Sequence, residues 1–238
     1  ILFVNYTFMK KNNIVIGLLC GGKGLRLRPI TADIPKPLVE IKNIPILEYI
    51  IKHLNNYQFS EYLIATGYKS NQISKFMKNN FNTLNYNIIN TGDVDIITRI
   101  RSLIERCSKS DIILCYGDTI SNVNLKKLIK FHLTKPTTMT VTSYPISIPF
   151  GVMEVTSANN VKAYTEKPIL KSVMNIGYFY ISNILFDKFY KYESFEDVLI
   201  NLTKDKKLKC YQHNGIHITV NTIKELEYAN ENITKIFK

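Results

Sequence analysis

The amino-acid sequence predicts an α/β fold with a mixed, mostly parallel central sheet, on the basis of three observations. Short apolar runs alternate with helical patterns in the first half of the chain, as they do in βαβ units. Strand-like runs follow one another closely in the second half, which predicts that the sheet is mixed. Of the 238 residues 45% are apolar, enough for the core of one large domain.

The first half is expected to alternate strands with helices. Apolar runs predict strands at residues 14–19, 62–65, 87–89 and 111–116. Helical periodicity lies between and after these runs, at residues 46–57, 70–78, 98–107 and 125–132. This alternation makes the predicted sheet mostly parallel.

The second half is expected to be richer in strands, with fewer and shorter helices. Strands are predicted at residues 138–143, 151–155, 161–165, 174–181 and 208–211. Helices are predicted near Phe186, at residues 195–202 and, closing the chain, at residues 222–236. No repeat or long linker divides the sequence, so a single domain over residues 9–238 is expected. Residues 1–8 are expected to be an extension that the fold does not need, because Met9-Lys10-Lys11 is typical of a natural start.

The composition narrows the class of protein. No apolar run is long enough for a transmembrane helix, and the four cysteines show no metal-binding spacing, so we expect a reduced, cytoplasmic protein without structural zinc or membrane contact. The net charge of +12 raises the alternative of nucleic-acid binding. The lysines are scattered, however, and the aromatic residues form no stacking pattern. An acidic small-molecule substrate is therefore the favoured partner.

The most informative segment is the glycine-rich stretch at residues 21–27, Gly-Gly-Lys-Gly-Leu-Arg-Leu, directly after the first predicted strand. Glycines there let backbone N–H groups approach an anion, and nearby cations supply the opposite charge. A P-loop is excluded, because Gly24 stands where a Ser or Thr is needed. A dinucleotide fingerprint is excluded, because Leu27 stands where a small residue is needed. A turn without a ligand is the alternative; the rigid, cationic continuation, with Arg26, Arg28, Lys36 and three prolines, favours a phosphate site.

Two further loops are expected at the same edge of the sheet. Gly67-Tyr68 follows the second predicted strand, and Gly117-Asp118 follows the fourth. Ligands of open α/β sheets bind outside the carboxyl ends of the strands. The first half of the domain is therefore predicted to bind a nucleotide, and the second half to shape an acceptor site.

The ordered set of motifs resembles the sugar-1-phosphate nucleotidyltransferases. In that family the loop reads approximately L-A-G-G-x-G-T-R-L, followed by K-P-M-V-E-I, and residues 18–27 and 34–41 are similar to it. The resemblance covers nearly the whole chain from about Met9, and it continues in order through Gly67-Tyr68-Lys69, Tyr116-Gly117-Asp118, Phe150-Gly151-Val152, Glu166-Lys167-Pro168, Asn175-Ile176-Gly177 and Val220-Asn221-Thr222. The segment from Asn90 to Asp93, and the placing of Asn221, are most similar to glucose-1-phosphate cytidylyltransferases.

The resemblance implies a Rossmann-like, three-layer fold of the glycosyltransferase-A type. It also implies transfer of a nucleoside monophosphate, CMP from CTP above all, to a sugar-1-phosphate or related small phosphate, with release of pyrophosphate and with Mg²⁺ as cofactor. The product would be an activated precursor for surface glycans. Thymidylyl, uridylyl or guanylyl transfer, and a degenerate protein that binds a nucleotide sugar with little turnover, are the alternatives; a homo-oligomer is left open.

Roles in the nucleotide half follow from motif position in that family. Arg26 and Lys36 are expected to hold the β- and γ-phosphates and to stabilise charge on the leaving group. Asp118 is expected to bind Mg²⁺, with helix capping as the alternative. The nucleotide itself is expected to contact Leu19, Gly21, Gly22, Gly24, Gly67, Tyr68 and Gly117.

Roles in the acceptor half are carried over in the same way. Lys167 is expected to contact the sugar-1-phosphate, with Glu166 and Asn175 on sugar hydroxyls; an exposed ion pair is the alternative for Glu166 and Lys167. Gly151 and Gly177 are expected to allow close approach of the sugar ring.

Three positions depart from the family pattern. Leu25 stands where the family usually has a Thr, and His217 stands where it usually has an aromatic residue; we expect His217 to pack, with contact to the substrate as the alternative. Asn221 or, in a shifted register, Thr219 stands where a second metal-binding Asp is usual. A neutral oxygen would hold the metal less tightly than a carboxylate.

Overall fold

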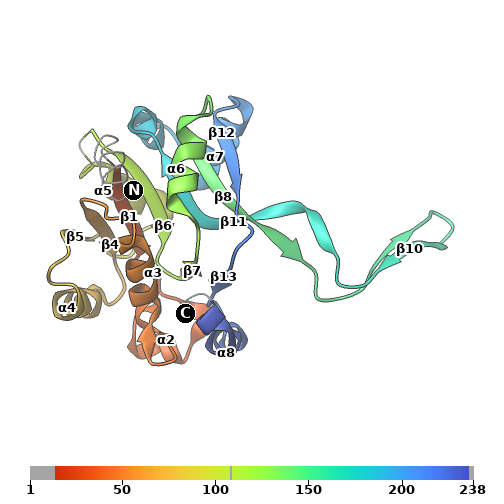
Figure 1. Ribbon diagram of the computed structural model, residues 1–238, viewed down its shortest axis with the longest axis horizontal. Coiled ribbons are helices and arrows are strands. Elements are labelled where there is room, and N and C mark those ends of the chain that lie inside the picture. The colour runs from red at the N-terminus through yellow and green to blue at the C-terminus, as the bar shows by residue number, and fades with distance from the viewer. Residues whose placement is uncertain (1–13, 108, 236–238) are drawn as a thin grey trace.

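The computed structural model describes residues 14–107 and 109–235, so the expectations for residues 1–8 and for Met9 lie outside the described residues. Its centre is a seven-stranded sheet in the order β12-β8-β11-β6-β1-β4-β5 (Figure 1). The strands are β1 (Ile14–Cys20), β4 (Tyr62–Thr66), β5 (Tyr86–Asn90), β6 (Asp111–Tyr116), β8 (Met139–Ser147), β11 (Ile169–Ile181) and β12 (Leu208–Gln212). β11 runs antiparallel to both β6 and β8, whereas the other neighbouring pairs are parallel. The predicted mixed, mostly parallel sheet is confirmed.

Helices cover both faces of this sheet. The helices are α2 (Ile30–Asp33), α3 (Ile46–Asn55), α4 (Ser70–Asn80), α5 (Ile96–Ile104), α6 (Leu125–Leu133), α7 (Phe195–Lys204) and α8 (Ile223–Asn232), with 3-10 segments η1 (Leu25–Leu27), η2 (Lys36–Leu38), η3 (Asn183–Tyr190) and η4 (Ile233–Lys235). Alternate residues of the central strands enter two separate apolar cores: Ile113 packs with α3, α4 and α6, whereas Ile112 packs with α5, η3 and α7. The fold therefore has the three layers that were predicted.

Local side chains explain where several helices begin. Asp95 accepts a hydrogen bond from the backbone N–H of Thr98, so α5 starts at Ile96, two residues before its predicted start. Thr222 and Glu225 form a capping box at the start of α8. The four cysteines, all within the described residues, are free.

Short strands that were not predicted frame the site. The hairpin of β2 (Glu40–Ile41) and β3 (Ile44–Pro45) leads into α3. β7 (Thr119–Ser121) pairs antiparallel with β13 (His217–Thr219), which brings residues 217–219 beside the segment that follows β6. Elements of two or three residues carry too little periodicity to be predicted from sequence.

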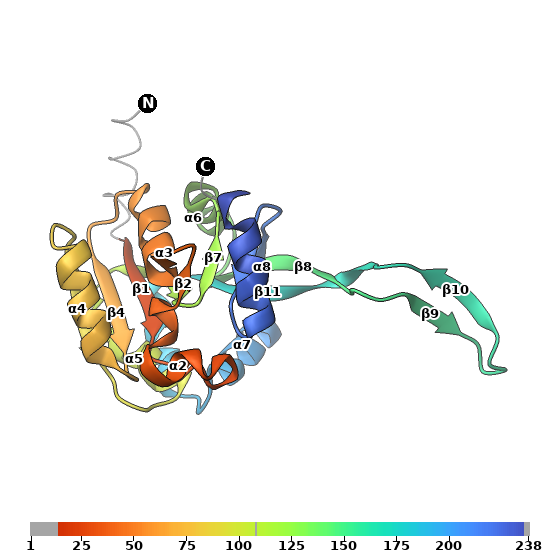
Figure 2. The same cartoon turned by 90° about the horizontal axis from the view of Figure 1, so that it is seen from below.

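An arm projects from the body of the molecule (Figures 1 and 2). It consists of residues 148–175: the hairpin of β9 (Val152–Val155) and β10 (Val161–Thr165), and the outer part of β11. Strands were predicted at these positions, but β9 and β10 form a separate two-stranded ladder instead of joining the central sheet. All residues in 152–167 and 169–175 are exposed.

Stability is expected to fall between about pH 6.5 and pH 4, because burial lowers the pKa of His132 to about 4. The imidazole hydrogen-bonds Thr140 and Ser182 at 2.8 Å and stacks on Tyr180, so it folds in its neutral form. In the unfolded chain it binds a proton near pH 6.5, so acid favours unfolding; the cost is about 3 kcal/mol by pH 4.

Urea unfolding across this pH range checks the prediction, with His132→Gln as the variant that cannot titrate. The pKa values of His53, His213 and His217 are also lowered, so the variant should keep part of the pH dependence. Identical pH dependence in the two proteins between pH 6.5 and 5 would contradict the role given to His132.

Candidate active site

The glycine-rich loop is held in a fixed shape behind the end of β1. Gly24 has a φ of 63°, a left-handed conformation that glycine adopts without strain. Its carbonyl accepts a hydrogen bond of 2.8 Å from the hydroxyl of Thr31. The backbone N–H of Tyr68 donates to the carbonyl of Gly21 at 3.2 Å, and the Tyr68 hydroxyl donates to the carbonyls of Thr31 and Ala32. Tyr68 therefore ties the loop to the segment that carries the cationic residues.

A pocket of about 290 Å³ opens at the carboxyl ends of β1 and β6. It is lined by Leu19, Cys20, Gly21, Gly22, Lys36, Pro37, Val94, Ile96, Arg99, Tyr116, Gly117 and Asp118. A side chain at position 22 would meet nothing within 4 Å, so the backbone there is open to a ligand. Six residues assigned to the nucleotide and its phosphates thus share one pocket: Leu19, Gly21, Gly22, Lys36, Gly117 and Asp118. Gly24, Gly67 and Tyr68 are not among the residues that line it.

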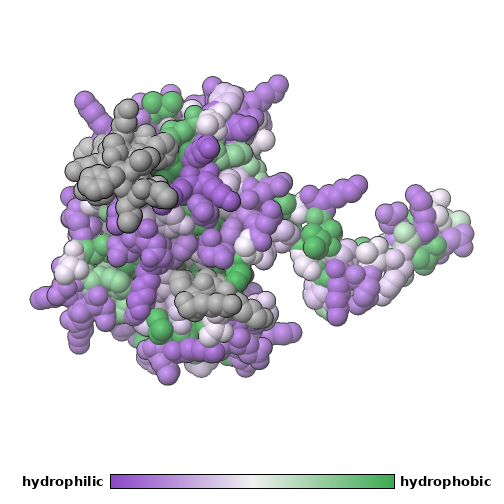
Figure 3. All heavy atoms as spheres, in the orientation of Figure 1, coloured by the Kyte–Doolittle hydropathy of each residue, from purple (hydrophilic) through white to green (hydrophobic). Residues whose placement is uncertain are grey.

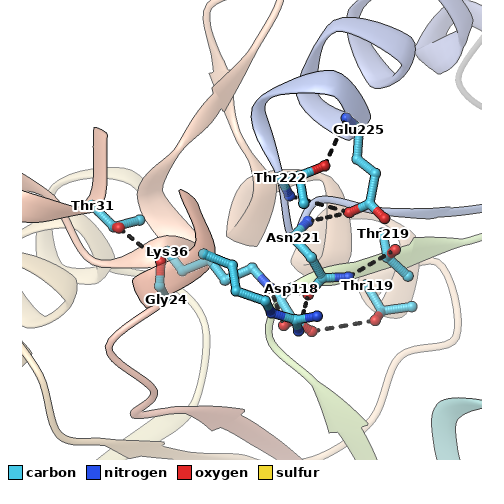
Figure 4. A network of polar contacts seen from close by, with 10 residues as sticks. Gly24, Thr31, Lys36, Asp118, Thr119, Thr219, Asn221, Thr222 and Glu225 are labelled. Carbon is cyan, nitrogen blue, oxygen red and sulfur yellow. Dashed lines mark hydrogen bonds and ion pairs between the residues drawn. The ribbon is translucent and has the colours of Figure 1, made fainter. Parts of the chain in front are cut away.

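Four polar side chains meet beside the pocket: Lys36 and Asp118 line it, whereas Asn221 and Arg26 do not. The Lys36 ammonium donates to Asp118 Oδ2 at 2.5 Å and to Asn221 Oδ1 at 2.8 Å, although Lys36 is only 8% exposed. Arg26 donates to the same Asn221 oxygen at 3.0 Å. Figure 4 shows Lys36, Asp118 and Asn221 pointing toward one another from three separate segments. Two cations and a carboxylate near a glycine-rich loop are the charges that a polyphosphate and its counterion would require.

The orientation of the Asn221 amide follows from its other contact. Its Nδ2 donates to the Thr219 hydroxyl at 3.2 Å, which leaves Oδ1 to accept from Lys36 and Arg26. The Thr219 hydroxyl contacts the nitrogen of this amide, whereas Asn221 presents its oxygen to the two cations. Asn221 is therefore a more suitable candidate metal ligand than Thr219, which the shifted register would use. The capping alternative for Asp118 is wrong: the side chain of Asn124 caps α6 by accepting from the N–H of Lys127 at 3.0 Å.

The donor set of this cluster fits a hard divalent cation. Lys36 Nζ lies between two oxygens, one from a carboxylate and one from an amide, and Mg²⁺ prefers oxygen ligands of these kinds. Within the described residues, no three His, Cys, Asp or Glu side chains come together as a metal-binding group. A cation held by Asp118 and Asn221 would therefore need phosphate oxygens and water to complete its coordination, as Mg²⁺ commonly does.

Arg99 is a pocket residue that sequence analysis missed. It is 6% exposed and donates to the carbonyls of Thr66, Gly92 and Val94 and to the Thr91 hydroxyl. A Cβ at position 21 would lie 1.6 Å from its Nη1, and one at position 67 would lie 2.8 Å from it. The guanidinium fills the space where a side chain at position 21 would lie, whereas at position 67 the Gly92 carbonyl oxygen, 2.3 Å from an added Cβ, is nearer still. One signal in the sequence could have revealed it: Ile96, Arg99 and Leu103 have the spacing of one helix face, so Arg99 shares a face with apolar residues.

We expect Arg99→Met to weaken nucleotide binding about tenfold and to destabilise the fold by about 2–4 kcal/mol, because buried carbonyls lose their donor and the glycine-rich loop loses its support. Titration calorimetry and urea unfolding measure the two effects. Arg101→Met is the matched control, because Arg101 donates to the carbonyls of Phe189 and Tyr192 and does not line the pocket. Equal nucleotide affinity in the two variants would contradict the positioning role of Arg99.

The residues assigned to the acceptor fall into two groups. Asn175 and Gly177 lie on β11 beside Tyr116, a pocket residue: Asn175 Oδ1 accepts from the N–H of Gly177 at 2.8 Å, and a Cβ at position 177 would lie 2.5 Å from the Tyr116 ring. Burial and then Asp118 raise the pKa of the Tyr116 phenol to about 12. Gly151, Glu166 and Lys167 lie on the arm, outside the residues that line the pocket, because the β8–β11 ladder continues outward from the sheet.

His217 and Leu25, two of the departures from the family pattern, do not line the pocket. The ring of His217 packs against Tyr144 with centroids 5.2 Å apart, and burial lowers its pKa to about 4. Its buried Nδ1 has no hydrogen-bond partner among the described residues. Leu25 is 57% exposed, and as a leucine it offers no hydroxyl at this position of the loop.

The fold and the charged groups beside this pocket are typical of an enzyme that acts on a nucleotide. The chain belongs to the nucleotidyl transferase family, whose sequence profile matches residues 16–235. The family and the enzyme class predicted from the sequence are confirmed.

Relatives of this chain differ in the nucleotide that their names say they transfer. A probable glucose-1-phosphate cytidylyltransferase from Bacillus subtilis (strain 168) is 34% identical over 240 residues, which cover 90% of this chain and 94% of the relative. A D-glycero-alpha-D-manno-heptose 1-phosphate guanylyltransferase from Aneurinibacillus thermoaerophilus is 28% identical over 174 residues, with coverage of 70% and 73%. The solved structure of HddC from Yersinia pseudotuberculosis has the same fold, with a TM-score of 0.72, 20% identity and coverage of 92% and 99%.

In the described part of the chain, no helix combines the length and hydrophobicity that crossing a membrane would require.

Proposed function

We propose that the protein transfers CMP from CTP to a sugar-1-phosphate and releases pyrophosphate. The observation that carries this is the cluster of Lys36, Asp118, Asn221 and Arg26, the first two of which line a pocket with Gly21, Gly22 and Gly117. The preference for CTP rests on the similarity to the Bacillus subtilis relative, a probable cytidylyltransferase. Guanylyl transfer is the second candidate, because the Aneurinibacillus thermoaerophilus relative is a guanylyltransferase.

In this reaction an oxygen of the sugar-1-phosphate attacks the α-phosphorus of CTP, and the bond between that phosphorus and the bridging oxygen breaks. The electron pair of the broken bond leaves with pyrophosphate. Backbone N–H groups at Gly21 and Gly22 would hold the triphosphate, and Lys36 and Arg26 would stabilise the charge that develops on the leaving group. No covalent intermediate with the protein is needed.

Asp118 and Asn221 would hold Mg²⁺ by one carboxylate and one amide oxygen. When bound, Mg²⁺ would neutralise phosphate charge. Lys36 has three N–H donors and can therefore contact Asn221 and a phosphate oxygen together. The proposed product, a CDP-activated sugar made in the cytoplasm, would serve surface-glycan assembly.

The test measures pyrophosphate release with each of CTP, UTP, dTTP, GTP and ATP, with Mg²⁺ and a panel of sugar-1-phosphates. We expect release with CTP and at least one acceptor. Release with GTP alone would support the guanylyl alternative. Tight nucleotide binding without release in any combination would overturn the proposal in favour of a degenerate binding protein.

Asn221→Asp is expected to lower the Mg²⁺ concentration needed for half-maximal activity by about three- to tenfold, because a carboxylate binds a hard cation better than an amide does. Calorimetric titration of Mg²⁺ into the protein with a non-hydrolysable CTP analogue checks this without turnover. Thr219→Val is the control: it removes the hydroxyl that accepts from the Asn221 amide and adds no charge. An unchanged Mg²⁺ affinity in Asn221→Asp would refute metal binding at this position.

A further inference from the structure

Lysines that are scattered in the sequence gather at one edge of the central sheet. Two segments carry eight of them: residues 122–138, which contain α6, and residues 203–214, which contain the edge strand β12. The eight are Lys126, Lys127, Lys130, Lys135, Lys204, Lys206, Lys207 and Lys209. Asp205 is the one acidic residue in these two segments of the sequence. This surface, here called the lysine edge, therefore carries more than half of the net charge of +12.

Contacts between α6 and β12 join the two segments into one surface. The ring of Phe131 in α6 packs against that of Tyr211 in β12, with centroids 5.7 Å apart. After α6 ends, the Thr137 hydroxyl donates to the carbonyl of Lys207 at 2.6 Å. Lys209 is two residues before Tyr211 on β12, so it lies on the same side of the strand as α6. Figure 3 shows hydrophilic residues over α6.

The protein does not neutralise the lysine edge by itself. Seven of the eight lysines are exposed, and Lys209 is partly buried. Within residues 14–107 and 109–235, none of the eight side chains forms an ion pair, and the Asp205 carboxylate is paired with Lys188 at 2.7 Å. Like charges that are held close together repel one another and destabilise the folded state. A surface with this excess of one sign is therefore expected to serve an anionic partner.

The exposed face of α6 fits a lipid surface better than a nucleic acid. Lys126, Lys130 and Leu133 are four and three residues apart, so they share this face, and Leu133 is 47% exposed. A basic helix face that also presents an apolar side chain is typical of proteins that bind anionic membranes. Nucleic-acid surfaces commonly use arginines and free aromatic rings. The two segments contain no arginine, and their aromatic rings, Phe131 and Tyr211, pack against each other.

Much of the lysine edge lies at the other end of the sheet from the pocket. β6, β8 and β12 run in the same direction, because β11 is antiparallel to both β6 and β8, and β12 is parallel to β8. The pocket opens at the carboxyl end of β6, whereas Lys206 and Lys207 precede the amino end of β12 and Lys135 precedes that of β8. In Figure 1, α6 and β12 lie at the end of the body away from α2 and α8. A partner on the lysine edge would therefore leave the pocket open.

We infer that the lysine edge binds the surface of an anionic lipid bilayer and holds the protein there as a peripheral protein. The lysine ammonium groups would contact lipid phosphates, and Leu133 would enter the headgroup layer. The expectation of no membrane contact came from the lack of a long apolar run, which binding at the surface does not require. The inference goes beyond the proposed function and does not rest on it, because vesicle binding is measured without turnover.

The experiment measures co-sedimentation of the full chain with vesicles of phosphatidylcholine, with and without phosphatidylglycerol, at low and at high salt. We expect binding to the anionic vesicles alone, and its loss at high salt, because dissolved ions screen exposed charges. Combining Lys126→Gln, Lys130→Gln and Lys207→Gln should weaken this binding about 10²-fold, since each lysine close to an anionic surface contributes about fivefold. No binding of the wild type to the anionic vesicles at low salt would overturn the inference.

The matched control combines Lys75→Gln, Lys78→Gln and Lys224→Gln, at exposed lysines of α4 and α8 that form no ion pair among the described residues. It lowers the net charge by the same amount and should change vesicle binding little. Equal weakening in the two variants would show that total charge, not the lysine edge, drives the binding, and would overturn the inference. Tighter binding of the wild type to duplex DNA or single-stranded RNA than to the anionic vesicles at the same salt would overturn it in favour of a nucleic-acid partner. Melting temperatures check that both variants are folded.

Discussion

Asp118→Asn is expected to lower the rate of pyrophosphate release by on the order of 10³ or more, an effect as large as the loss of a major electrostatic group at an active site. Asp118 is the acidic residue among those described as lining the pocket, and it lies 2.5 Å from the Lys36 ammonium. Asn has nearly the same shape but no charge. It therefore removes the carboxylate that we propose for Mg²⁺ while the side chain keeps its place.

The variant should also separate catalysis from folding. The Asp118 side chain is one-third exposed, and Lys36 keeps Asn221 as an acceptor, so the melting temperature should change little. Nucleotide affinity measured without metal should be retained, whereas the gain in affinity on adding Mg²⁺ should be lost. Asp205→Asn, at the exposed ion pair with Lys188, serves as the control with unchanged activity. A fully active Asp118→Asn enzyme would disprove the metal assignment.

The part of the site that could be predicted was the part fixed by strand ends. Gly21 and Asp118 follow β1 and β6, and these strands are adjacent and parallel, so the two loops had to meet at one edge. The position of Lys36 could also be predicted, because it lies in the cationic continuation of the glycine-rich loop after β1. The meeting of Lys36 with Asn221, 185 positions further along the chain, required the β7–β13 pair, which is too short to be recognised in the sequence.

The unpredicted features depend on tertiary contacts. Arg99 has the sequence context of a residue on an amphipathic helix, and its role becomes visible only because four acceptors surround the guanidinium. The arm shows the same limit: β9 and β10 have the residue types of strands, but the pattern does not say whether a strand joins the central sheet or forms a separate, exposed hairpin. The sequence therefore predicts that these strands exist, and not that they leave the body.

Lys36→Met is expected to lower kcat by about 10²- to 10³-fold with a much smaller change in KM, because its ammonium would act on charge that develops on the leaving pyrophosphate. Methionine keeps most of the buried stem and removes the charge. Steady-state kinetics with CTP and the acceptor measure the split between kcat and KM, and Lys188→Met, at the exposed ion pair with Asp205, is the matched control.

The two kinetic parameters distinguish a catalytic role of Lys36 from a purely structural one. If the ammonium only neutralised Asp118 in the folded protein, Lys36→Met would chiefly change stability and Mg²⁺ affinity, since Asp118 would lose its closest cation. If it only bound the triphosphate, KM would rise with kcat unchanged. Lys36→Arg sharpens the choice: it keeps the charge but spreads it over a planar fork in a space where the lysine is 8% exposed, so part of the kcat should return without full recovery. Equal kcat in Lys36→Met and the wild type would show that Lys36 has no catalytic role. Arg26 would then be the remaining candidate for the cation that stabilises the leaving group.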